Sequence, residues 1–135
     1  MSNVYDLYWQ LVEAIQKGDN EKTRSLLAPD FVLHQDPGMP YGGTYEGPDA
    51  FMDHIAHIFG TAWGGTNFTP EFQLVDDENQ RINTVVHLEG NIGPNKTHVE
   101  TWVNEIWEFR DGKAVKERNW YWNTPAITRA LAGED

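Results

Sequence analysis

The sequence predicts an α+β fold. Three N-terminal helices are expected to pack on the concave face of a cone-shaped, curved antiparallel (mixed) sheet, with a short helix at the C-terminus. Helical periodicity dominates the first half of the chain, alternation with a period of two dominates the second half, and Asp111-Gly112 is a hairpin signal between the last two alternating segments. Helices followed by a long antiparallel meander are typical of folds whose helices lie on one face of a sheet. With 135 residues and no internal repeat, the chain is expected to form one domain, residues 1–135.

Helical spacing and capping signals define the four expected helices. The first has apolar residues three and four positions apart and ends at Gly18, which suits a helix terminus. A glycine-rich loop, Tyr41–Gly47, leads into the third helix, and Pro48 suits the first position of that helix. Thr124 can cap the last helix, with Pro125 at its first position. The expected ranges are 4–17, 20–27, 48–62 and 126–131.

Alternation of apolar and polar residues, bounded by turn residues, defines five expected strands. The first ends before Pro37, which cannot extend a ladder of backbone hydrogen bonds. Polar turns at 76–80 and 90–95 separate the next three strands. The expected ranges are 31–36, 69–75, 81–89, 97–109 and 114–122.

Composition narrows the classes of function. The chain has no cysteine, so disulfides, thiolate metal sites and thiol nucleophiles are excluded. A formal net charge of -11 opposes binding to nucleic acid, whose phosphates need clustered Lys and Arg. The amino terminus lacks the pattern of a signal peptide and no segment approaches the length of a membrane span, so we expect a cytoplasmic protein with no membrane partner. Six Trp, five Tyr and six Phe indicate an aromatic core, a cavity for an apolar ligand, or both.

Asp36 is the first candidate catalytic residue. It ends the alternating stretch Phe31–Asp36, in which His34 shares its face, and Pro37-Gly38 follows at once. An acid at the end of a strand, beside an imidazole, could take a proton from a bound molecule. Aspartate before Pro-Gly is also typical of turns. Taken alone, these residues favour the turn and leave the catalytic interpretation open.

Glu105 is the second candidate. It lies on the more apolar face of its strand, which is expected to line a cavity and consists of Val99, Thr101, Val103, Glu105 and Trp107. Burial there would raise the pKa of the carboxyl group, and the neutral acid could donate a hydrogen bond to a carbonyl oxygen that gains charge. Trp102 and Ile106 on the opposite face leave the reverse orientation open.

Four stretches of the chain carry a resemblance to known proteins: 26–31, 40–47, 107–113 and 121–126. In this order they resemble the nuclear-transport-factor-2-like superfamily over essentially the whole chain, and SnoaL-like proteins most closely. That superfamily includes ketosteroid isomerases, polyketide cyclases, limonene epoxide hydrolases and scytalone dehydratases. Because one fold hosts many chemistries, the resemblance says more about fold than about reaction.

The resemblance also implies roles for particular residues. Asp36 matches the general base of the ketosteroid isomerases, and Glu105 matches their second acid, which is kept protonated. The phenol that completes their site would stand at Leu11, so another tyrosine would have to replace it. Tyr5, Tyr8 and Tyr41 are the alternatives.

The remaining expected site residues line the pocket. The resemblance places His54 of the third helix there, together with the Trp120 and Trp122 face of the last strand. Periodicity leaves that face open, because Glu117, Asn119 and Tyr121 alternate with the two tryptophans. The expected catalytic residues are Asp36, Glu105 and His34, and the expected substrate-binding residues are His54, Trp107, Trp120, Trp122, Tyr41 and Leu11. The sequence contains no local metal-ligand motif, so no metal and no cofactor are expected.

These observations favour a small cofactor-free enzyme that performs acid–base chemistry on an apolar small molecule in the cone. An isomerase, cyclase, dehydratase or epoxide hydrolase would fit, and the sequence does not choose among them. The alternative is a non-catalytic module of the same fold that binds a small molecule or pairs with a partner domain. Leu11 in place of the phenol and Asn123 in place of a further acid favour that alternative. The resemblance also implies a homodimer, for which Trp102 and Ile106 on the outer face of the sheet could form the interface.

Overall fold

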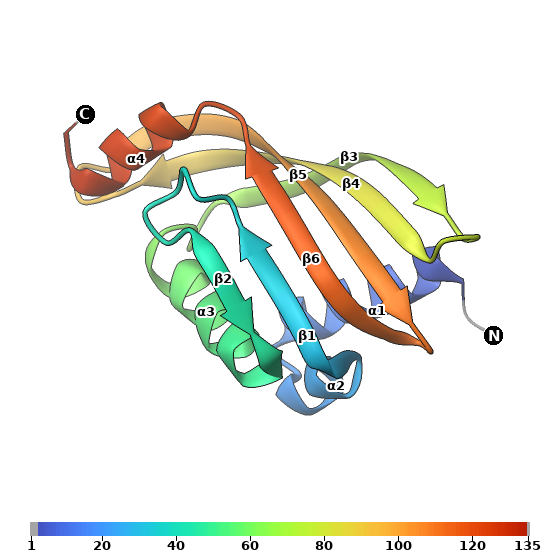
Figure 1. Cartoon of the computed structure of the whole chain (residues 1–135). Helices are drawn as coiled ribbons and strands as arrows, with labels where there is room; N and C mark the ends of the chain where they lie inside the picture. The colour runs from blue at the N-terminus through green and yellow to red at the C-terminus, as the bar shows by residue number, and fades with distance from the viewer. Residues whose placement is uncertain (1–2, 135) are drawn as a thin grey trace.

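The computed structural model describes residues 3–134 and confirms the α+β fold (Figure 1). Its helices are α1 (Val4–Lys17), α2 (Asn20–Ser25), α3 (Gly47–Thr61) and α4 (Thr124–Ala132). Its strands are β1 (Leu27–Gln35), β2 (Gly43–Glu46), β3 (Asn67–Asp76), β4 (Arg81–Ile92), β5 (Thr97–Arg110) and β6 (Lys113–Tyr121). Within residues 3–134, none of the helices combines the length and the apolar character needed to cross a membrane.

All the strands belong to one curved, mixed sheet, in the order β2-β1-β6-β5-β4-β3. The pair formed by β1 and β6 is parallel, and every other neighbouring pair is antiparallel. The helices α1 and α3 lie across the same face, while α4 lies at the far end of the sheet (Figure 1). The inner face is therefore enclosed by helices, and the opposite, outer face of the sheet carries none.

The helix ends follow the capping signals in part. The Asn3 side chain accepts the backbone N–H of Asp6 at the start of α1, and Gly18, with φ of 69°, ends this helix in the left-handed region. The carboxylate of Asp19 caps α2. In α4, however, the cap position is Asn123 rather than Thr124, and no side chain caps that helix.

Several element boundaries differ from the predicted ranges, and two of these differences come from sheet pairing. The glycine-rich segment predicted as a loop contains β2, an edge strand that pairs with the end of β1. The second helix ends at Ser25, because Leu27 already pairs with Ala114 as the first residue of β1. Sheet pairing between residues distant in sequence decided both boundaries, and local periodicity does not report such pairing.

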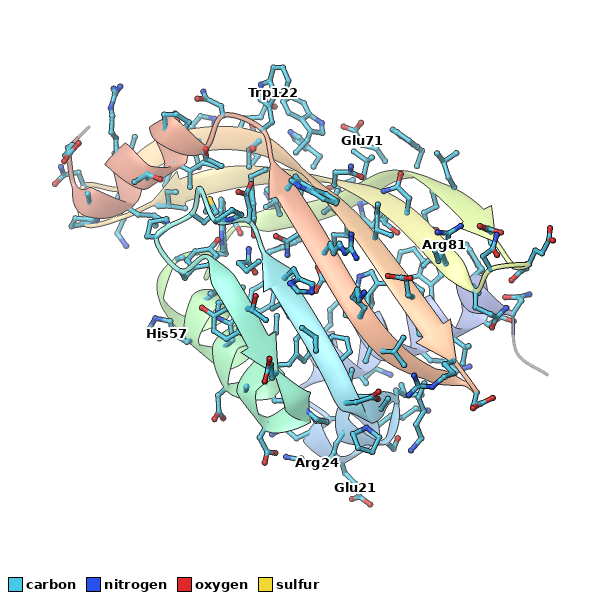
Figure 2. The ribbon with its side chains drawn as sticks, viewed as in Figure 1. Glu21, Arg24, His57, Glu71, Arg81 and Trp122 are labelled. Carbon is cyan, nitrogen blue, oxygen red and sulfur yellow. The ribbon has the colours of Figure 1, made fainter. Side chains whose placement is uncertain are left out.

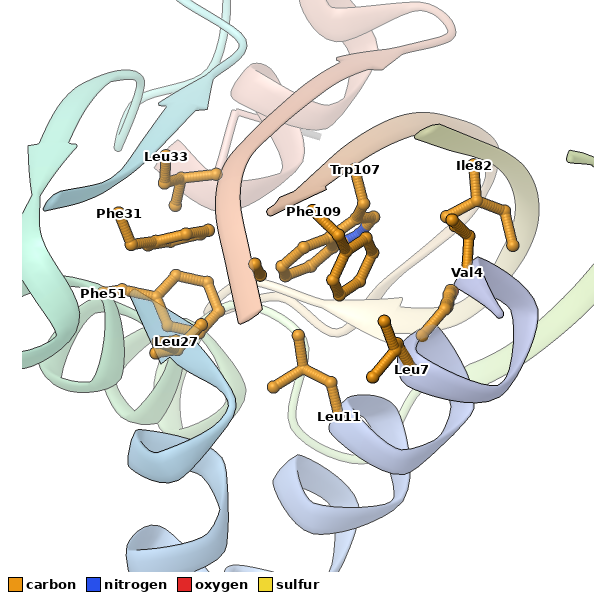
Figure 3. Packing of buried hydrophobic residues seen from close by; sticks show 12 residues of the cluster. Val4, Leu7, Leu11, Leu27, Phe31, Leu33, Phe51, Ile82, Trp107 and Phe109 are labelled. Atoms are coloured by element: carbon orange, nitrogen blue, oxygen red, sulfur yellow. The ribbon is translucent and has the colours of Figure 1, made fainter. Parts of the chain in front are cut away.

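An aromatic cluster joins the helices to the sheet (Figure 3). The ring of Phe31 stacks against Trp107 with a centroid distance of 5.9 Å, and Phe51 of α3 meets Phe31 edge-on at 5.0 Å. Leu7 and Leu11 of α1 pack on the same cluster. Each buried aromatic side chain removes a large apolar surface from water, so this cluster fixes α1 and α3 against the inner face.

Candidate functional site

The inner face of the sheet and the two covering helices enclose a cavity of about 470 Å³. Its wall comes from α1, α3, the 63–66 loop and strands β3 to β6. The residues lining it are Tyr8, Val12, Ile15, Gln16, Phe51, Ile55, Phe59, Trp63, Gly64, Gly65, Thr66, Phe68, Pro70, Val86, Glu105, Trp107 and Glu117. A cavity of this size with mostly apolar walls and a few acids is typical of small-molecule sites.

Glu105 lies on the cavity wall, on the inward face of β5 that the alternation favoured. Its Oε1 accepts a hydrogen bond from the Tyr8 hydroxyl at 3.3 Å and lies 3.4 Å from the Trp107 indole nitrogen. Burial raises the pKa of Glu105 from about 4.5 to about 7, while the bonds from Trp107 and Tyr8 act in the opposite direction. This carboxyl group can therefore hold or release a proton near neutral pH.

Glu117 of β6 is a second buried acid that the sequence analysis did not assign to the site. It lines the same cavity, and its Oε2 accepts a hydrogen bond from the Asn119 amide at 3.1 Å. Burial, together with the negative charge of Glu105, raises its pKa well above the ordinary value. Both effects favour the protonated form of Glu117.

Tyr8 supplies the phenol that Leu11 cannot. Leu11 is buried in the core beneath α1, where it contacts other apolar side chains rather than the cavity (Figure 3). Tyr8 lies three residues earlier, almost one helical turn away, and its hydroxyl reaches Glu105. Of the three alternatives that the sequence left open, the structure brings Tyr8 to the acid.

Asp36 and His34 lie away from the cavity. The inward residues of β1 are Phe31, Leu33 and Gln35, so the two candidates point to the other side. One carboxylate oxygen of Asp36 accepts the N–H of Gly38 at 2.8 Å, and the other accepts the N–H of Tyr121 at 2.9 Å. The expected meeting of Asp36 with Glu105 is thus absent, and the turn interpretation of Asp36 describes its contacts.

His54 and Tyr41 lie behind the cavity wall. His54 is buried, stacks on the ring of Tyr45 with centroids 3.9 Å apart, and has its Nε2 3.2 Å from Gln35 Oε1. Burial lowers its pKa, which keeps the imidazole neutral. The Tyr41 hydroxyl lies 3.3 Å from that of Tyr121 and accepts the indole N–H of Trp63. Both side chains support residues that reach the cavity.

The three expected tryptophans separate. Trp107 lines the cavity, whereas Trp120 and Trp122 are 45% and 69% exposed on the other side of the sheet. Figure 2 shows Trp122 outside the end of β6. The inward face of β6 instead carries Glu117, Asn119 and Tyr121, so the orientation that the resemblance implied for this strand is wrong. Alternation gave the correct grouping but not its direction, because Glu117 and Asn119 look like surface residues.

His34, Asp36, His54 and Glu105, which include side-chain types that can bind zinc or iron, do not converge. His34 and Asp36 face outward, His54 lies behind the wall, and only Glu105 faces the cavity. Among residues 3–134, no three His, Asp or Glu side chains gather closely enough to hold a metal ion. The functional groups of this site are therefore two carboxyl groups and a phenol.

Comparison with known proteins agrees with this architecture. The sequence model of a family described as the SnoaL-like domain matches residues 9–117. No curated protein matches the sequence.

Several solved structures resemble the chain. An NTF2-like protein of unknown function from Burkholderia pseudomallei has 24% sequence identity and a TM-score of 0.79, with 97% of this chain and 98% of that chain covered. TerC, co-crystallised with polyporic acid, has 21% identity and a TM-score of 0.79, with 97% and 99% covered. A protein from a Jannaschia species, described as a SnoaL-like polyketide cyclase, has 15% identity and a TM-score of 0.77, with 96% and 91% covered. At these identities the similarity establishes the fold.

Proposed function

The chain belongs to the SnoaL-like domain family, and from that premise we propose that it is a small enzyme that moves protons on an apolar small molecule bound in its cavity. One observation carries the proposal. Glu105 places a carboxyl group with a pKa of about 7 on the wall of an otherwise mostly apolar cavity. A general base is most effective when its pKa lies near the working pH.

In the proposed mechanism Glu105 is the proton carrier. Its carboxylate takes a proton from an activated carbon of the ligand, the bonding electrons move onto the neighbouring carbonyl oxygen, and the resulting acid returns the proton to carbon or oxygen. The Tyr8 hydroxyl holds the carboxylate in place. Glu117, kept protonated by burial and by its charged neighbour, can donate to an oxygen that becomes negative.

This assignment differs from the one expected from sequence. The base moves from Asp36 to Glu105, and the neutral acid moves from Glu105 to Glu117. Isomerisation, aldol-type cyclisation and dehydration all contain such a proton transfer, so the proposal names the shared step rather than one of these reactions. The mostly apolar lining supports an apolar ligand, and TerC, a protein of this fold, was co-crystallised with a small molecule, polyporic acid.

The test is deuterium exchange into 2-tetralone, a bicyclic ketone with acidic protons beside its carbonyl. Proton NMR in D₂O would follow the exchange with the wild-type protein, with Glu105→Gln and with Glu108→Gln. Glu108 is the matched control, because it lies on the same strand but faces Lys116 on the outer side. We expect Glu105→Gln to slow the protein-dependent exchange by roughly 10²–10⁴ and Glu108→Gln to leave it unchanged. Equal rates in the wild-type protein and Glu105→Gln would refute the proposal, and binding without exchange would favour a non-catalytic carrier.

We also propose that the protein forms a homodimer through the outer face of the sheet. An apolar patch, the outer patch, covers that face and consists of Phe72, Leu74, Trp102, Ile106 and Trp120. Phe72 and Leu74 are 51% and 63% exposed, which is unusual for large apolar side chains on neighbouring positions of one sheet face. Pairing two copies of this patch would remove it from water.

A further inference from the structure

A smaller chamber of about 60 Å³ extends the cavity between α3 and the sheet. Glu105 and Glu117 line both spaces, so the two spaces adjoin at the acid pair. Beyond the acids, the polar lining of this inner chamber comes from Gln35, Asn119 and Tyr121. The proposed mechanism assigns no role to these three residues.

The backbone N–H of Asp36 fixes the orientation of the Asn119 and Gln35 side-chain amides. Its N–H can only donate, so the Asn119 atom at 3.0 Å is the amide oxygen. The Asn119 nitrogen then donates to Glu117 at 3.1 Å and to Gln35 at 3.4 Å.

The same reasoning orients Gln35. The atom that accepts from Asn119 must be the Gln35 oxygen, which also lies 3.2 Å from His54 Nε2. The Gln35 nitrogen therefore faces the Tyr121 hydroxyl, to which it donates at 3.2 Å. The reverse orientation would place two N–H donors of Asn119 and Gln35 against each other.

In this group of residues, some donor hydrogens have no acceptor. The hydroxyl groups of Tyr121 and Tyr41 are joined by one hydrogen bond, which uses one of their two hydrogens. Each hydroxyl oxygen also accepts an N–H, from Gln35 at Tyr121 and from Trp63 at Tyr41. One phenolic hydrogen is therefore left over. The second N–H of Gln35, a buried residue, likewise has no acceptor among residues 3–134. Every buried side-chain nitrogen and oxygen in this range has at least one hydrogen-bond partner. The excess therefore consists of single hydrogens on nitrogen and oxygen atoms that already make another hydrogen bond.

We propose that the inner chamber is a subsite for a neutral ligand oxygen, held by the Tyr121 hydroxyl and the free N–H of Gln35. The Tyr41 hydroxyl donates to the Tyr121 hydroxyl, so the free phenolic hydrogen belongs to Tyr121, which lines the chamber while Tyr41 does not. A carbonyl oxygen accepts two hydrogen bonds and fits this pair of donors. The Glu105 carboxylate beside the chamber disfavours a carboxylate or phosphate there, because a second negative charge would be desolvated next to it.

The subsite adds detail to the proposed function. It rests on that function in one respect, which is that the ligand is a ketone. A carbonyl oxygen at Tyr121 and Gln35 would place the carbon beside it towards Glu105, since Glu105 lines the junction of the two spaces. Charge that develops on the oxygen during proton transfer would then meet two fixed donors. Tyr121 and Gln35 would bind the reacting group, and Asn119 would act as a positioning residue through both Gln35 and Glu117.

The experiment compares the affinities of 2-tetralone and tetralin, which share a ring system but differ in the carbonyl oxygen. Titration calorimetry on the wild-type protein, Tyr121→Phe and Tyr41→Phe gives the ratio of the two dissociation constants. The ratio cancels general loosening of the cavity, which affects both ligands. Tyr41→Phe is the matched control, because it removes a phenol from the same pair and leaves the Tyr121 hydrogen free for the ligand.

We expect the wild-type protein to prefer the ketone and Tyr121→Phe to reduce this preference by about five- to tenfold, the effect of one lost hydrogen bond. Tyr41→Phe should retain the wild-type ratio. A wild-type protein without preference for the ketone, or an unchanged ratio in Tyr121→Phe, would overturn the proposal. In a crystal of the wild-type protein with 2-tetralone, a carbonyl oxygen away from Tyr121 would do the same. These readouts need no turnover, so absent exchange with an intact ratio would refute only the proposed enzyme activity.

Discussion

Glu105 and Glu117 face the same cavity from neighbouring strands, offset diagonally across the sheet. The register pairs Glu105 with Asn119 and Trp107 with Glu117, which places the two acids two residues out of direct opposition and on one face. Glu117 is buried and Glu105 is half-buried on the cavity wall, and the charge of Glu105 further raises the pKa of Glu117. Burying this pair costs free energy, so substitution of either acid should change the free energy of unfolding as well as the activity.

Glu117→Gln should stabilise the protein at neutral pH. The folded-state pKa of Glu117 is raised, so below about pH 4.5 both folded and unfolded chains hold the proton and burial carries no titration cost. As the pH rises, Glu117 ionises first in the unfolded chain, so the free energy of unfolding of the wild-type protein falls. Glutamine cannot ionise, so the variant should escape this fall and be more stable than the wild-type protein at pH 7.

Urea unfolding at pH 5 and pH 8 measures this difference. The wild-type protein should lose more stability between the two values than Glu117→Gln, while Glu108→Gln on the outer face should follow the wild type. Identical pH dependence in the wild-type protein and Glu117→Gln would mean that Glu117 titrates as an ordinary surface acid.

Tyr8→Phe should shift the pH dependence of exchange towards higher pH. The active form of Glu105 in the proposed mechanism is the carboxylate, so the exchange rate should rise with pH through a midpoint of about 7. The Tyr8 hydroxyl donates to that carboxylate and lowers its pKa, so removing the hydroxyl should raise the midpoint. A pH profile of deuterium exchange would measure the shift, with the exposed Tyr5→Phe as control. A midpoint that stays in place or falls would show that Tyr8 does not tune Glu105.

Asp36→Asn should weaken the fold but preserve exchange. The two carboxylate oxygens of Asp36 accept backbone N–H groups from Gly38 and Tyr121, and an amide offers only one oxygen for both. We expect a loss of about 1–2 kcal/mol in the free energy of unfolding, with the exchange rate per folded molecule unchanged. Asp53→Asn, an exposed position on α3, is the control for charge removal. A large loss of exchange in fully folded Asp36→Asn would return Asp36 to the mechanism.

Leu74→Glu should convert a dimer into a monomer. Leu74 is 63% exposed in the outer patch, and a charge there would have to be buried when two copies pair. The neighbouring residue Val75 is 44% exposed but points to the other face of β3, so Val75→Glu is a matched control. Sedimentation velocity at micromolar concentration should show dimers for the wild type and Val75→Glu. A wild-type protein that sediments as a monomer would refute the proposed interface.

Much of the fold could be predicted because local signals and long-range packing agree. The apolar spacing of α1, the glycine at its end and the Asp111-Gly112 hairpin are local signals, and the elements that they predict are present in the fold. The edge strand β2 could not be predicted, because its four residues are ordered by pairing with β1 rather than by their own pattern.

The site was predictable only where burial follows hydrophobicity. Glu105 lies among valine and tryptophan along β5, so its inward face could be read from the alternation. Glu117 could not, because Glu117, Asn119 and Tyr121 look like a solvated face. In the fold Glu117 and Asn119 are buried and hydrogen-bonded to each other. Asp36 was a misleading candidate because β1 turns Gln35 inward. The next position along the chain faces the other side, so Asp36 points away from the cavity.

The central claim, a proton-holding Glu105 in the cavity, is tested most directly by a carbon-13 NMR titration of the glutamate carboxyl groups. In the wild-type protein we predict a resonance that titrates near pH 7 and is missing from Glu105→Gln. If Glu105 instead titrates together with the exposed glutamates between about pH 4 and pH 5, the carboxyl group is a normally hydrated acid and the account is wrong.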